Sequence, residues 1–183
     1  MIDIGGGLVL RPWEARDAGV VLAAFAAPEM ERQADEPLNS LADAERWIAR
    51  RAADREADVA YAFAVAVAYA DGGTALGNVA VSAVNRTHGV GWVSYWTAPQ
   101  ARGRGVASRG CAALAHWAFL ELGLFRLELG HRVNNPASCA VARAAGFVVE
   151  GVQRQKLAYD GVRYDVELHA RLASDGRAGS ARP

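Results

Sequence analysis

The sequence predicts a single domain with a mixed α/β fold. Its 183 residues are enough for one domain with a substantial core. Hydrophobic residues make up 52% of the chain and many are alanine, so small side chains form part of that core. Segments of strand period alternate with segments of helical period, separated by turns that contain Gly or Pro. The resulting order is strand, two helices, three strands, helix, strand, helix and two strands.

The first half of the chain is predicted to hold one strand, two helices and a three-stranded meander. The strand covers Leu8–Trp13, and Ala15–Phe25 has helical spacing. Ser40 is expected to cap a second helix that ends near Ala57, with Asp43 at the capping-box position. The meander strands are predicted over 61–70, 76–84 and 90–97, with turns at 71–73 and 85–89.

The second half is predicted to begin with a long helix over Val106–Leu122, which Gly123 ends. A strand over 124–133, a short helix over 136–145 and two strands over 147–158 and 163–172 complete the fold. The ordered domain is therefore expected to span residues 8–172. Residues 173–183 are rich in Gly, Ser and Arg and are expected to be disordered.

Composition argues against several classes of protein. The 20 basic and 20 acidic residues cancel, so no specific nucleic-acid partner is expected. Two cysteines, Cys111 and Cys139, are too few for a disulfide framework or a Cys-rich zinc site, and no metal is expected. Neither a signal-peptide pattern nor a run of about 18 apolar residues is found, which predicts a cytoplasmic protein without a membrane partner.

The most informative segment is the Arg/Gly-rich run from Gln100 to Ser108, between an apolar strand and a helix. Glycines allow close approach of the backbone to a ligand, and the first N–H groups of a helix have no internal partner. Arg102 and Arg104 add positive charge, so the segment predicts a phosphate or pyrophosphate site. A P-loop is excluded because no lysine follows Gly105, and the order of elements does not fit a dinucleotide-binding unit. An ordinary glycine turn before a helix remains the alternative.

Further motifs resemble the GNAT superfamily of N-acetyltransferases. Gln100-x-x-Gly103-x-Gly105 is similar to its Gln/Arg-x-x-Gly-x-Gly/Ala signature. Downstream motifs resemble the branch of ribosomal-protein N-terminal acetyltransferases (RimJ/RimL-like): Asn134–Ser138, Gly146-Phe147 and Glu150-Gly151, together with Leu8-x-Leu10-Arg11, Asp17 and Gly161-x-x-x-Asp165. The resemblance spans about Leu8 to Leu172.

The resemblance implies a single GNAT-like domain that binds acetyl-CoA. Its sheet would be mixed, mostly antiparallel and twisted, with about seven strands flanked by about four helices. A V-shaped gap between the fourth and fifth strands, 90–97 and 124–133, would hold the coenzyme. Tyr95 and Thr97 would offer main-chain groups to pantetheine and the acetyl carbonyl, and Asn135 would contact the coenzyme or act as a helix N-cap. The pyrophosphate would be bound by Arg102, Gly103, Arg104, Gly105, Val106 and Ala107.

The resemblance also implies direct acyl transfer to a primary amine. The Thr97 amide would stabilise the oxyanion, and Ser138 would protonate the departing thiolate or else satisfy the helix start. Trp92 stands where many relatives carry an acidic base. The sequence therefore leaves His131 and Asp165 as candidate bases and pocket residues, while Trp92 could shape an aromatic pocket or pack in the core or a dimer.

Three questions stay open in the sequence. The amine acceptor could be a protein N-terminus or a small molecule, and a homodimer is common in this branch. The loss of the acidic base leaves a second interpretation, a catalytically inactive CoA-binding sensor or structural module. A covalent route through Cys139 is disfavoured because the sequence shows no activating base at a spacing that would identify it as the partner of this cysteine.

Overall fold

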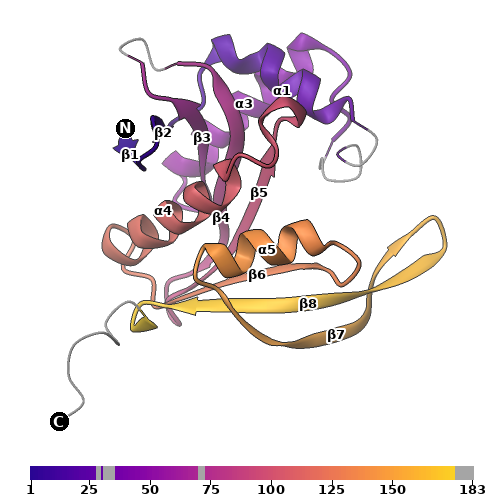
Figure 1. Cartoon of the computed structure of the whole chain (residues 1–183). Helices are drawn as coiled ribbons and strands as arrows, with labels where there is room; N and C mark the ends of the chain where they lie inside the picture. The colour runs from indigo at the N-terminus through magenta and orange to yellow at the C-terminus, as the bar shows by residue number, and fades with distance from the viewer. Residues whose placement is uncertain (28–29, 31–35, 70–72, 176–183) are drawn as a thin grey trace. The chain divides into compact units, whose positions relative to one another are not determined.

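The structure, a computed structural model, describes residues 1–27, 30, 36–69 and 73–175. Its strands form one eight-stranded sheet in the order β1-β2-β3-β4-β5-β6-β8-β7 (Figure 1). The strands are β1 Ile2–Asp3, β2 Leu8–Arg11, β3 Tyr61–Val67, β4 Ala75–Asn85, β5 Val90–Thr97, β6 Arg126–Arg132, β7 Val148–Tyr159 and β8 Val162–Leu172. The helices are α1 Ala18–Phe25, α3 Leu41–Glu56, α4 Val106–Leu120 and α5 Pro136–Ala144, with short 3-10 turns η1 Ala15–Asp17 and η2 Pro99–Ala101. The predicted mixed α/β fold is confirmed, with the two-residue β1 as an addition.

The sheet contains a parallel pair, β5 with β6, next to antiparallel pairs. The parallel register matches Val90–Trp92 with Arg126–Glu128. Beyond these residues β5 continues to Thr97 and β6 to Arg132. The pairs β1 with β2, β2 with β3, β6 with β8 and β7 with β8 are antiparallel. The parallel pairing therefore covers the first three residues of β5.

Residue contacts divide the chain into two compact units, the first made of residues 1–80 and 95–110. Its core contains Trp13, Phe25, Trp47 and Trp96, whose ring centroids lie between 5.4 and 6.4 Å apart in the contacting pairs. Edge and stacked contacts of this kind add to the burial of apolar area. The rings fix α1 and α3 against the strands of the same unit.

A buried ion pair joins β2 to the start of the first helical segment. The Arg11 Nη1 and Nη2 atoms donate to the two Asp17 carboxylate oxygens at 2.7 and 2.8 Å. Both residues are buried, at 1% and 3% exposure. Arg11 Nη2 also donates to the Gly73 carbonyl at 2.9 Å. Two parallel charge-assisted bonds satisfy a charge that would be costly to bury alone.

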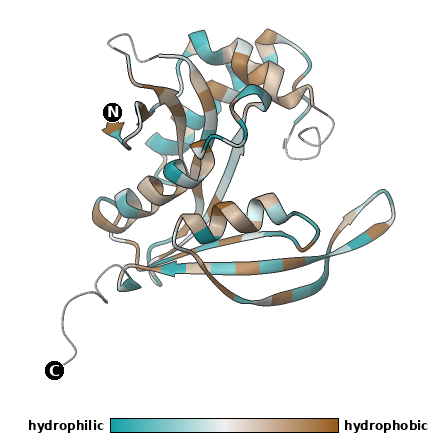
Figure 2. Ribbon diagram, viewed as in Figure 1, coloured by the Kyte–Doolittle hydropathy of each residue, from teal (hydrophilic) through white to brown (hydrophobic). Residues whose placement is uncertain are grey.

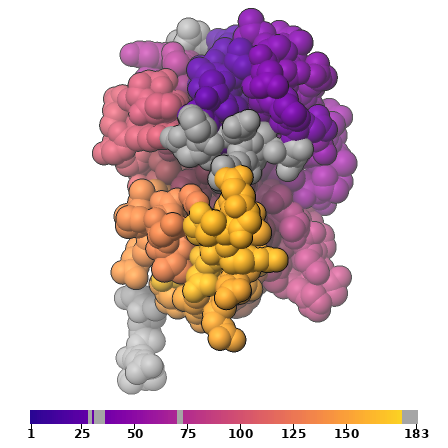
Figure 3. All heavy atoms as spheres, turned by 90° about the vertical axis from the view of Figure 1, so that its right-hand side faces the viewer, coloured from indigo at the N-terminus to yellow at the C-terminus, as the bar shows by residue number. Residues whose placement is uncertain are grey.

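The second unit contains residues 81–94 and 111–183. On β6 the side chains of Leu127, Leu129 and His131 alternate with less buried neighbours, as a strand with one covered face requires. Helix α5 contacts β6. Hydrophilic and hydrophobic residues alternate along β8 in Figure 2. The β8 and α5 atoms, yellow and orange in Figure 3, reach the surface on the face turned to the viewer.

Most predicted boundaries agree with the structure to within a few residues. The strand predicted over 61–70 ends at Val67, and the helix predicted to Leu122 ends at Leu120. The Ser40 cap is confirmed, because the Asp43 backbone N–H donates to Ser40 Oγ at 3.2 Å. Turn residues 71–72 and the predicted tail from 176 onward lie outside the described residues. Among the described helices, none is long and apolar enough to cross a membrane.

Candidate active site

The Arg/Gly-rich segment forms an exposed loop between two buried anchors. Strand β5 ends at Thr97, the turn η2 follows, and α4 begins at Val106. Ala101 is 0% exposed and Val106 only 3%, whereas 102–105 are exposed. The core therefore holds both ends of the loop. Of the predicted phosphate-binding residues, 102–105 face solvent, whereas Val106 and Ala107 are buried at the start of α4.

Two glycines make the tight path of this loop possible. Gly103 and Gly105 both have φ of 72°, a left-handed conformation that is strained for residues with a side chain. A Cβ on Gly105 would lie 3.5 Å from Arg109 Nη2, whereas one on Gly103 would meet open space. The first N–H groups of α4 follow at once and have no partners inside the helix. The loop and helix start thus combine the features of a backbone anion site.

A third arginine, which the sequence prediction did not include, supports the loop. Arg109 Nη2 donates to the Arg104 carbonyl at 2.8 Å. An ideal Cβ on Gly6 would lie 1.8 Å from Arg109 Nη1, so this guanidinium packs directly against a residue without a side chain. Arg102 Nε donates to the Thr97 carbonyl at 3.4 Å. Two arginines of the loop and Arg109 of α4 therefore lie at this site. The position of Arg109, one helical turn after Gly105, is the sequence signal that could have identified this third arginine.

Tyr95 and Thr97, the predicted main-chain partners of the coenzyme, lie at the end of β5. Both are half-buried, and Trp96 between them belongs to the aromatic core. Because side chains alternate along a strand, Tyr95 and Thr97 point away from the face that Trp96 occupies. All of the predicted coenzyme contacts from Tyr95 to Ala107 fall within the first unit.

The second unit carries the other predicted coenzyme residues at the start of α5. Asn135 is the N-cap of this helix, since its side-chain oxygen accepts a hydrogen bond from the Ser138 backbone N–H at 3.1 Å. The N-cap role that the sequence left open is therefore confirmed, while coenzyme contact by Asn135 stays a prediction. Ser138 lies half-buried in the first turn.

His131 belongs to a cluster of polar side chains beneath α5. Its Nε2 atom lies 2.9 Å from His169 Nε2, and its Nδ1 atom lies 2.9 Å from the Arg132 carbonyl oxygen. Glu167 Oε1 lies 2.9 Å from His169 Nε2 and accepts from the Cys139 thiol at 3.3 Å. Sequence reasoning considered His131 and Cys139 but missed Glu167 and His169.

The cluster keeps Cys139 in its thiol form. Partial burial, and then the hydrogen bond to Glu167, raise the pKa of Cys139 above its ordinary value. The same hydrogen bond lowers the pKa of Glu167. A protonated thiol is a poor nucleophile, which agrees with the argument against a covalent cysteine route.

Trp92 packs against β6, and Asp165 supports the β7–β8 ladder at a shift in its register. A Cβ on Gly130 would lie 3.1 Å from the Trp92 ring and 2.9 Å from Val166, so the indole covers a position that has room only for glycine. Lys156 Nζ lies 5.8 Å from the Trp92 ring centroid. Asp165 Oδ1 accepts from the Gln155 backbone N–H at 2.8 Å. Their catalytic or pocket roles stay predictions.

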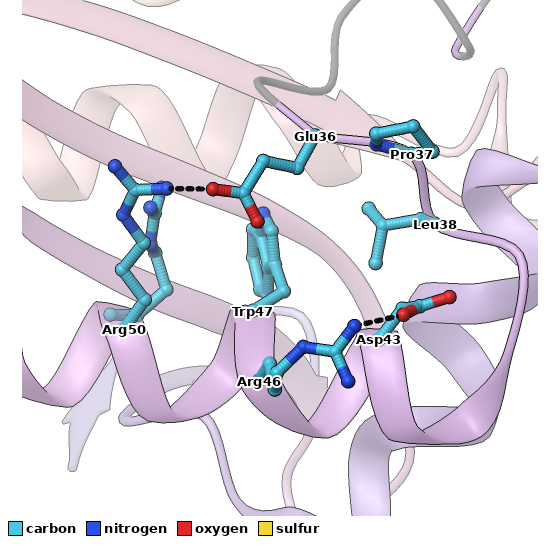
Figure 4. Close-up of a pocket in the computed structure, with 8 residues that line it drawn as sticks. Glu36, Pro37, Leu38, Asp43, Arg46, Trp47 and Arg50 are labelled. Atoms are coloured by element: carbon cyan, nitrogen blue, oxygen red, sulfur yellow. Dashed lines mark hydrogen bonds and ion pairs between the residues drawn. The ribbon is translucent and has the colours of Figure 1, made fainter.

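A separate small pocket of about 50 Å³ lies between α3 and the chain segment before it (Figure 4). Figure 4 shows Glu36 paired with Arg50 and Asp43 paired with Arg46, and the first pair is separated by 3.2 Å. The guanidinium carbon of Arg51, another lining residue, is 5.1 Å from the centroid of the Trp47 ring. Residues lining the pocket are Glu36, Pro37, Leu38, Asp43, Arg46, Trp47, Arg50 and Arg51.

Comparison with known proteins places these features in a family context. Residues 7–148 match the family model described as an acetyltransferase (GNAT) domain. A ribosomal-protein-serine acetyltransferase of Escherichia coli is 33% identical over 92 residues, 50% of each chain. YdaF of Bacillus subtilis is 29% identical over 100 residues, 55% of each chain, so the match spans about half the length of these curated relatives.

The fold comparison extends over more of the chain. The structure of Mycobacterium smegmatis RimJ in complex with CoA-disulfide has a TM-score of 0.80 and 22% sequence identity. The match covers 95% of this chain and 85% of that one. At this identity the likeness establishes the shared fold.

Proposed function

This chain belongs to the GNAT acetyltransferase family, and from that premise we propose that it transfers the acetyl group of acetyl-CoA to a primary amine. The observation that carries the proposal is the exposed loop at 102–105, which leads into the buried start of α4. The loop and the start of α4 combine backbone N–H groups, two glycines with positive φ and three arginines, a combination suited to a pyrophosphate.

Backbone hydrogen bonds would supply most of the affinity for the pyrophosphate. Each charge-assisted bond contributes about 1.5–3 kcal/mol, whereas the dipole of α4 alone contributes about 0.3–1 kcal/mol. We assign pyrophosphate binding to 102–107, with Tyr95, Thr97 and Asn135 as further coenzyme contacts. Arg109 joins the set as a positioning residue because it holds the Arg104 carbonyl.

The proposed reaction is direct transfer without an acyl-enzyme. The neutral amine forms a C–N bond to the thioester carbonyl, and the resulting oxyanion accepts a hydrogen bond from the Thr97 amide. When the C–S bond breaks, the thiolate takes a proton from Ser138, which regains one from solvent, and the amine loses its extra proton to water. The raised pKa of Cys139 supports the absence of a cysteine intermediate.

The missing acid favours an acceptor that is already partly neutral. Without a dedicated base at Trp92, the reaction depends on the fraction of amine that is unprotonated. At pH 7 an α-amino group with a pKa of about 7.7–8.0 is neutral in roughly one molecule in ten, but an alkylamine with a pKa of about 10.4 in only about one in 2,500. We therefore propose a protein N-terminus as the preferred acceptor. The name of the Escherichia coli relative, a ribosomal-protein-serine acetyltransferase, supports a protein acceptor.

The pocket beside α3 supports the same choice over a polyamine. A polyamine site needs carboxylates with unsatisfied charge. In this pocket Glu36 and Asp43 are each paired with an arginine, and Arg51 is paired with Asp54 at 3.3 Å. The pocket therefore offers no carboxylate with unsatisfied charge among these residues to a cationic chain.

Isothermal titration calorimetry with acetyl-CoA tests the coenzyme part of the proposal. Gly103→Val and Gly105→Val should each weaken binding by more than about tenfold, because the left-handed path is lost. Gly123→Val is the matched control: it has φ of 65°, lies after α4 and has open space around it. Wild-type protein that binds no acetyl-CoA, or loop variants that bind as well as Gly123→Val, would overturn the assignment.

Free-thiol release in the presence of amines tests the acceptor. A panel of N-terminal peptides and alkylamines, measured between pH 7 and pH 9, should give faster turnover with the peptides, and the difference should narrow as pH rises. Position 92 carries Trp where an acidic base was expected, and this also supports a second candidate, a CoA-binding sensor without catalysis. Binding of acetyl-CoA with no amine-dependent thiol release across the panel would select that second candidate.

We also propose that the protein forms a homodimer. The β7–β8 hairpin exposes Val148, Val152 and Val162, each more than half accessible. They lie at separate points along the hairpin, since Val148 pairs with Ala170, Val152 with Glu167 and Val162 with Tyr159. Because β7 is the last strand of the sheet, exposed apolar side chains on this hairpin favour association with another copy of the chain. Light scattering of the wild type should give twice the mass of the chain, and Val152→Lys should shift the measured mass toward that of one chain. A wild-type protein with the mass of one chain at all concentrations would contradict the proposal.

A further inference from the structure

We propose that His131, Cys139, Glu167 and His169 form a site for a divalent transition-metal ion, with zinc as the best match. This goes beyond the proposed acetyl transfer and is independent of it. The expectation of a metal-free protein rested on the number of cysteines, and this cluster needs only one. Its four ligand atoms lie within 4.8 Å of one another.

The sheet register brings the strand residues of the cluster to one face. His131 on β6 lies opposite Glu167 on β8. Glu167 and His169 are two residues apart on β8, so their side chains point to the same side. Cys139 comes from α5, which contacts β6, and its thiol reaches Glu167. Three elements of the second unit therefore contribute to one cluster.

The distances between ligand atoms are close to those of a tetrahedral zinc site. Zn–N bonds of about 2.0–2.1 Å place neighbouring nitrogen ligands about 3.3 Å apart in a tetrahedron. Here the two histidine Nε2 atoms are 2.9 Å apart, and His131 Nε2 lies 3.4 Å from Glu167 Oε1. Cys139 Sγ lies 3.3 Å from the same oxygen. The pairs between Cys139 and the histidines reach at most 4.8 Å, so the thiol would have to move toward the rings by about 1 Å to complete the tetrahedron.

Hydrogen bonds alone do not satisfy the cluster when both rings are neutral. His131 Nδ1 lies against the Arg132 carbonyl, which only accepts, so that nitrogen carries the proton and Nε2 carries a lone pair. Glu167 also only accepts when ionised. His169 Nε2 lies 2.9 Å from both acceptors and has at most one hydrogen to give. A bound cation would instead use the lone pairs of all three residues at once.

The ligand set and its surroundings select zinc over hard cations. Two imidazoles, one thiol and one carboxylate are the donors of zinc sites, whereas calcium and magnesium prefer oxygen. The His131 Nδ1–H bond to a backbone carbonyl is the outer contact that orients metal-bound histidines. His131 and His169 are 8% and 1% exposed, so the ion would be largely shielded from water.

Metal binding would assign His131 a structural role instead of a catalytic one. Its Nε2 lone pair would be used by the ion and its Nδ1 proton by the Arg132 carbonyl, so neither nitrogen could accept a proton from an amine. The ion would also connect α5 to β6 and β8, and thereby hold the helix that Asn135 caps. Deprotonation of Cys139 on binding would release a proton to solvent.

Titration of the full chain, with any affinity tag removed and metals stripped by chelator, tests the site. Cobalt(II) should bind as one ion per chain and give the visible absorption of a tetrahedral ion together with a near-ultraviolet thiolate band. Cys139→Ser should abolish the thiolate band, and Cys139→Ser and Glu167→Gln should each weaken zinc binding by more than about tenfold. His88→Gln is the control, because His88 is an exposed histidine outside the cluster.

Circular dichroism establishes that each variant is folded, and alkylation gives a second readout on the wild type. Zinc should slow iodoacetamide modification of Cys139 by more than about tenfold, since a metal-bound thiolate is blocked. Cys111, which is fully buried, serves as the internal reference. Folded protein that binds no zinc, a cobalt spectrum unchanged in Cys139→Ser, or alkylation of Cys139 that zinc does not slow would each overturn the site.

Discussion

Breaking the buried pair of Arg11 and Asp17 should strongly destabilise the first unit. We expect Asp17→Asn to keep the size of the side chain but to remove the carboxylate that forms both short ionic contacts with Arg11, so that the Glu14 carboxylate, 3.9 Å from Arg11 Nη1, is the ion pair that remains. The acceptor of the two hydrogen bonds of 2.7 and 2.8 Å loses its negative charge, in a site where both residues are at most 3% exposed. The Gly73 carbonyl would remain as an acceptor, at 2.9 Å from Arg11 Nη2.

The expected magnitude follows from the burial of the charge. Removing one partner of a buried ion pair costs about 3–5 kcal/mol of unfolding free energy. For a domain of this size about 1 kcal/mol changes Tm by about 2–4 °C, so the predicted loss is about 6–20 °C. The exposed pair of Arg50 and Glu36 is the matched control, since side-chain exposures of 51% and 75% predict a loss of only about 0.2–1 kcal/mol for Glu36→Gln.

Urea denaturation of the wild type, Arg11→Met, Asp17→Asn and the double variant measures the free energy of unfolding of each protein. The double variant Arg11→Met/Asp17→Asn should be more stable than the sum of the two single changes predicts, because no unpaired charge is left in the core. The reasoning would be refuted by a loss below about 1 kcal/mol for Asp17→Asn, or by strictly additive losses in the double variant.

Three further predictions concern the loop and the second unit. Arg109→Met should weaken acetyl-CoA binding about tenfold by calorimetry, because the loop carbonyl loses a charged donor; unchanged affinity would contradict the positioning role. Arg126 lowers the pKa of Glu150, so the stability from this pair is present above about pH 4.3 and is lost as pH falls through the lowered pKa. Glu150→Gln should therefore flatten the acid-induced loss of stability, and parallel urea curves against pH for both proteins would argue against it. With chelator present, Cys139 should react with iodoacetamide more slowly than a free thiol at pH 7, and Glu167→Gln should speed the reaction by lowering the raised pKa of Cys139; equal rates in both proteins would exclude the hydrogen bond as a cause.

The sequence predicted those parts of the fold and site that depend on local chemistry. Ser40 caps α3 as expected, and the glycine-rich turn before α4 lies where it was expected, with positive φ at Gly103 and Gly105. Such features are encoded within a few residues, where turn and cap preferences are strong. Strand β1 was missed for the opposite reason, because Ile2–Asp3 forms a strand only by pairing with Val9 and Leu10.

The cluster beneath α5 could not be derived from sequence spacing. Whether His131 meets Glu167 and His169 depends on the β6–β8 register, and a shift of one residue would place them on opposite faces. The sequence nevertheless contains a weak signal for this cluster. On β8 the residues Glu167, His169 and Arg171 share one face, next to a strand whose buried row includes His131, and polar residues on a covered face need partners.

The same alternation shows why His131 cannot simply replace the acid that relatives carry at the position of Trp92. The Trp92 ring packs at Gly130, together with Val166, so it occupies the Gly130 face of β6. His131 is the next residue and points to the other face, where its ring meets His169. A base on that face does not stand where a carboxylate at position 92 would. With neither Trp92 nor His131 as the base, we propose that the amine gives up its proton to water, which favours the weakly basic N-terminus of a protein as the acceptor.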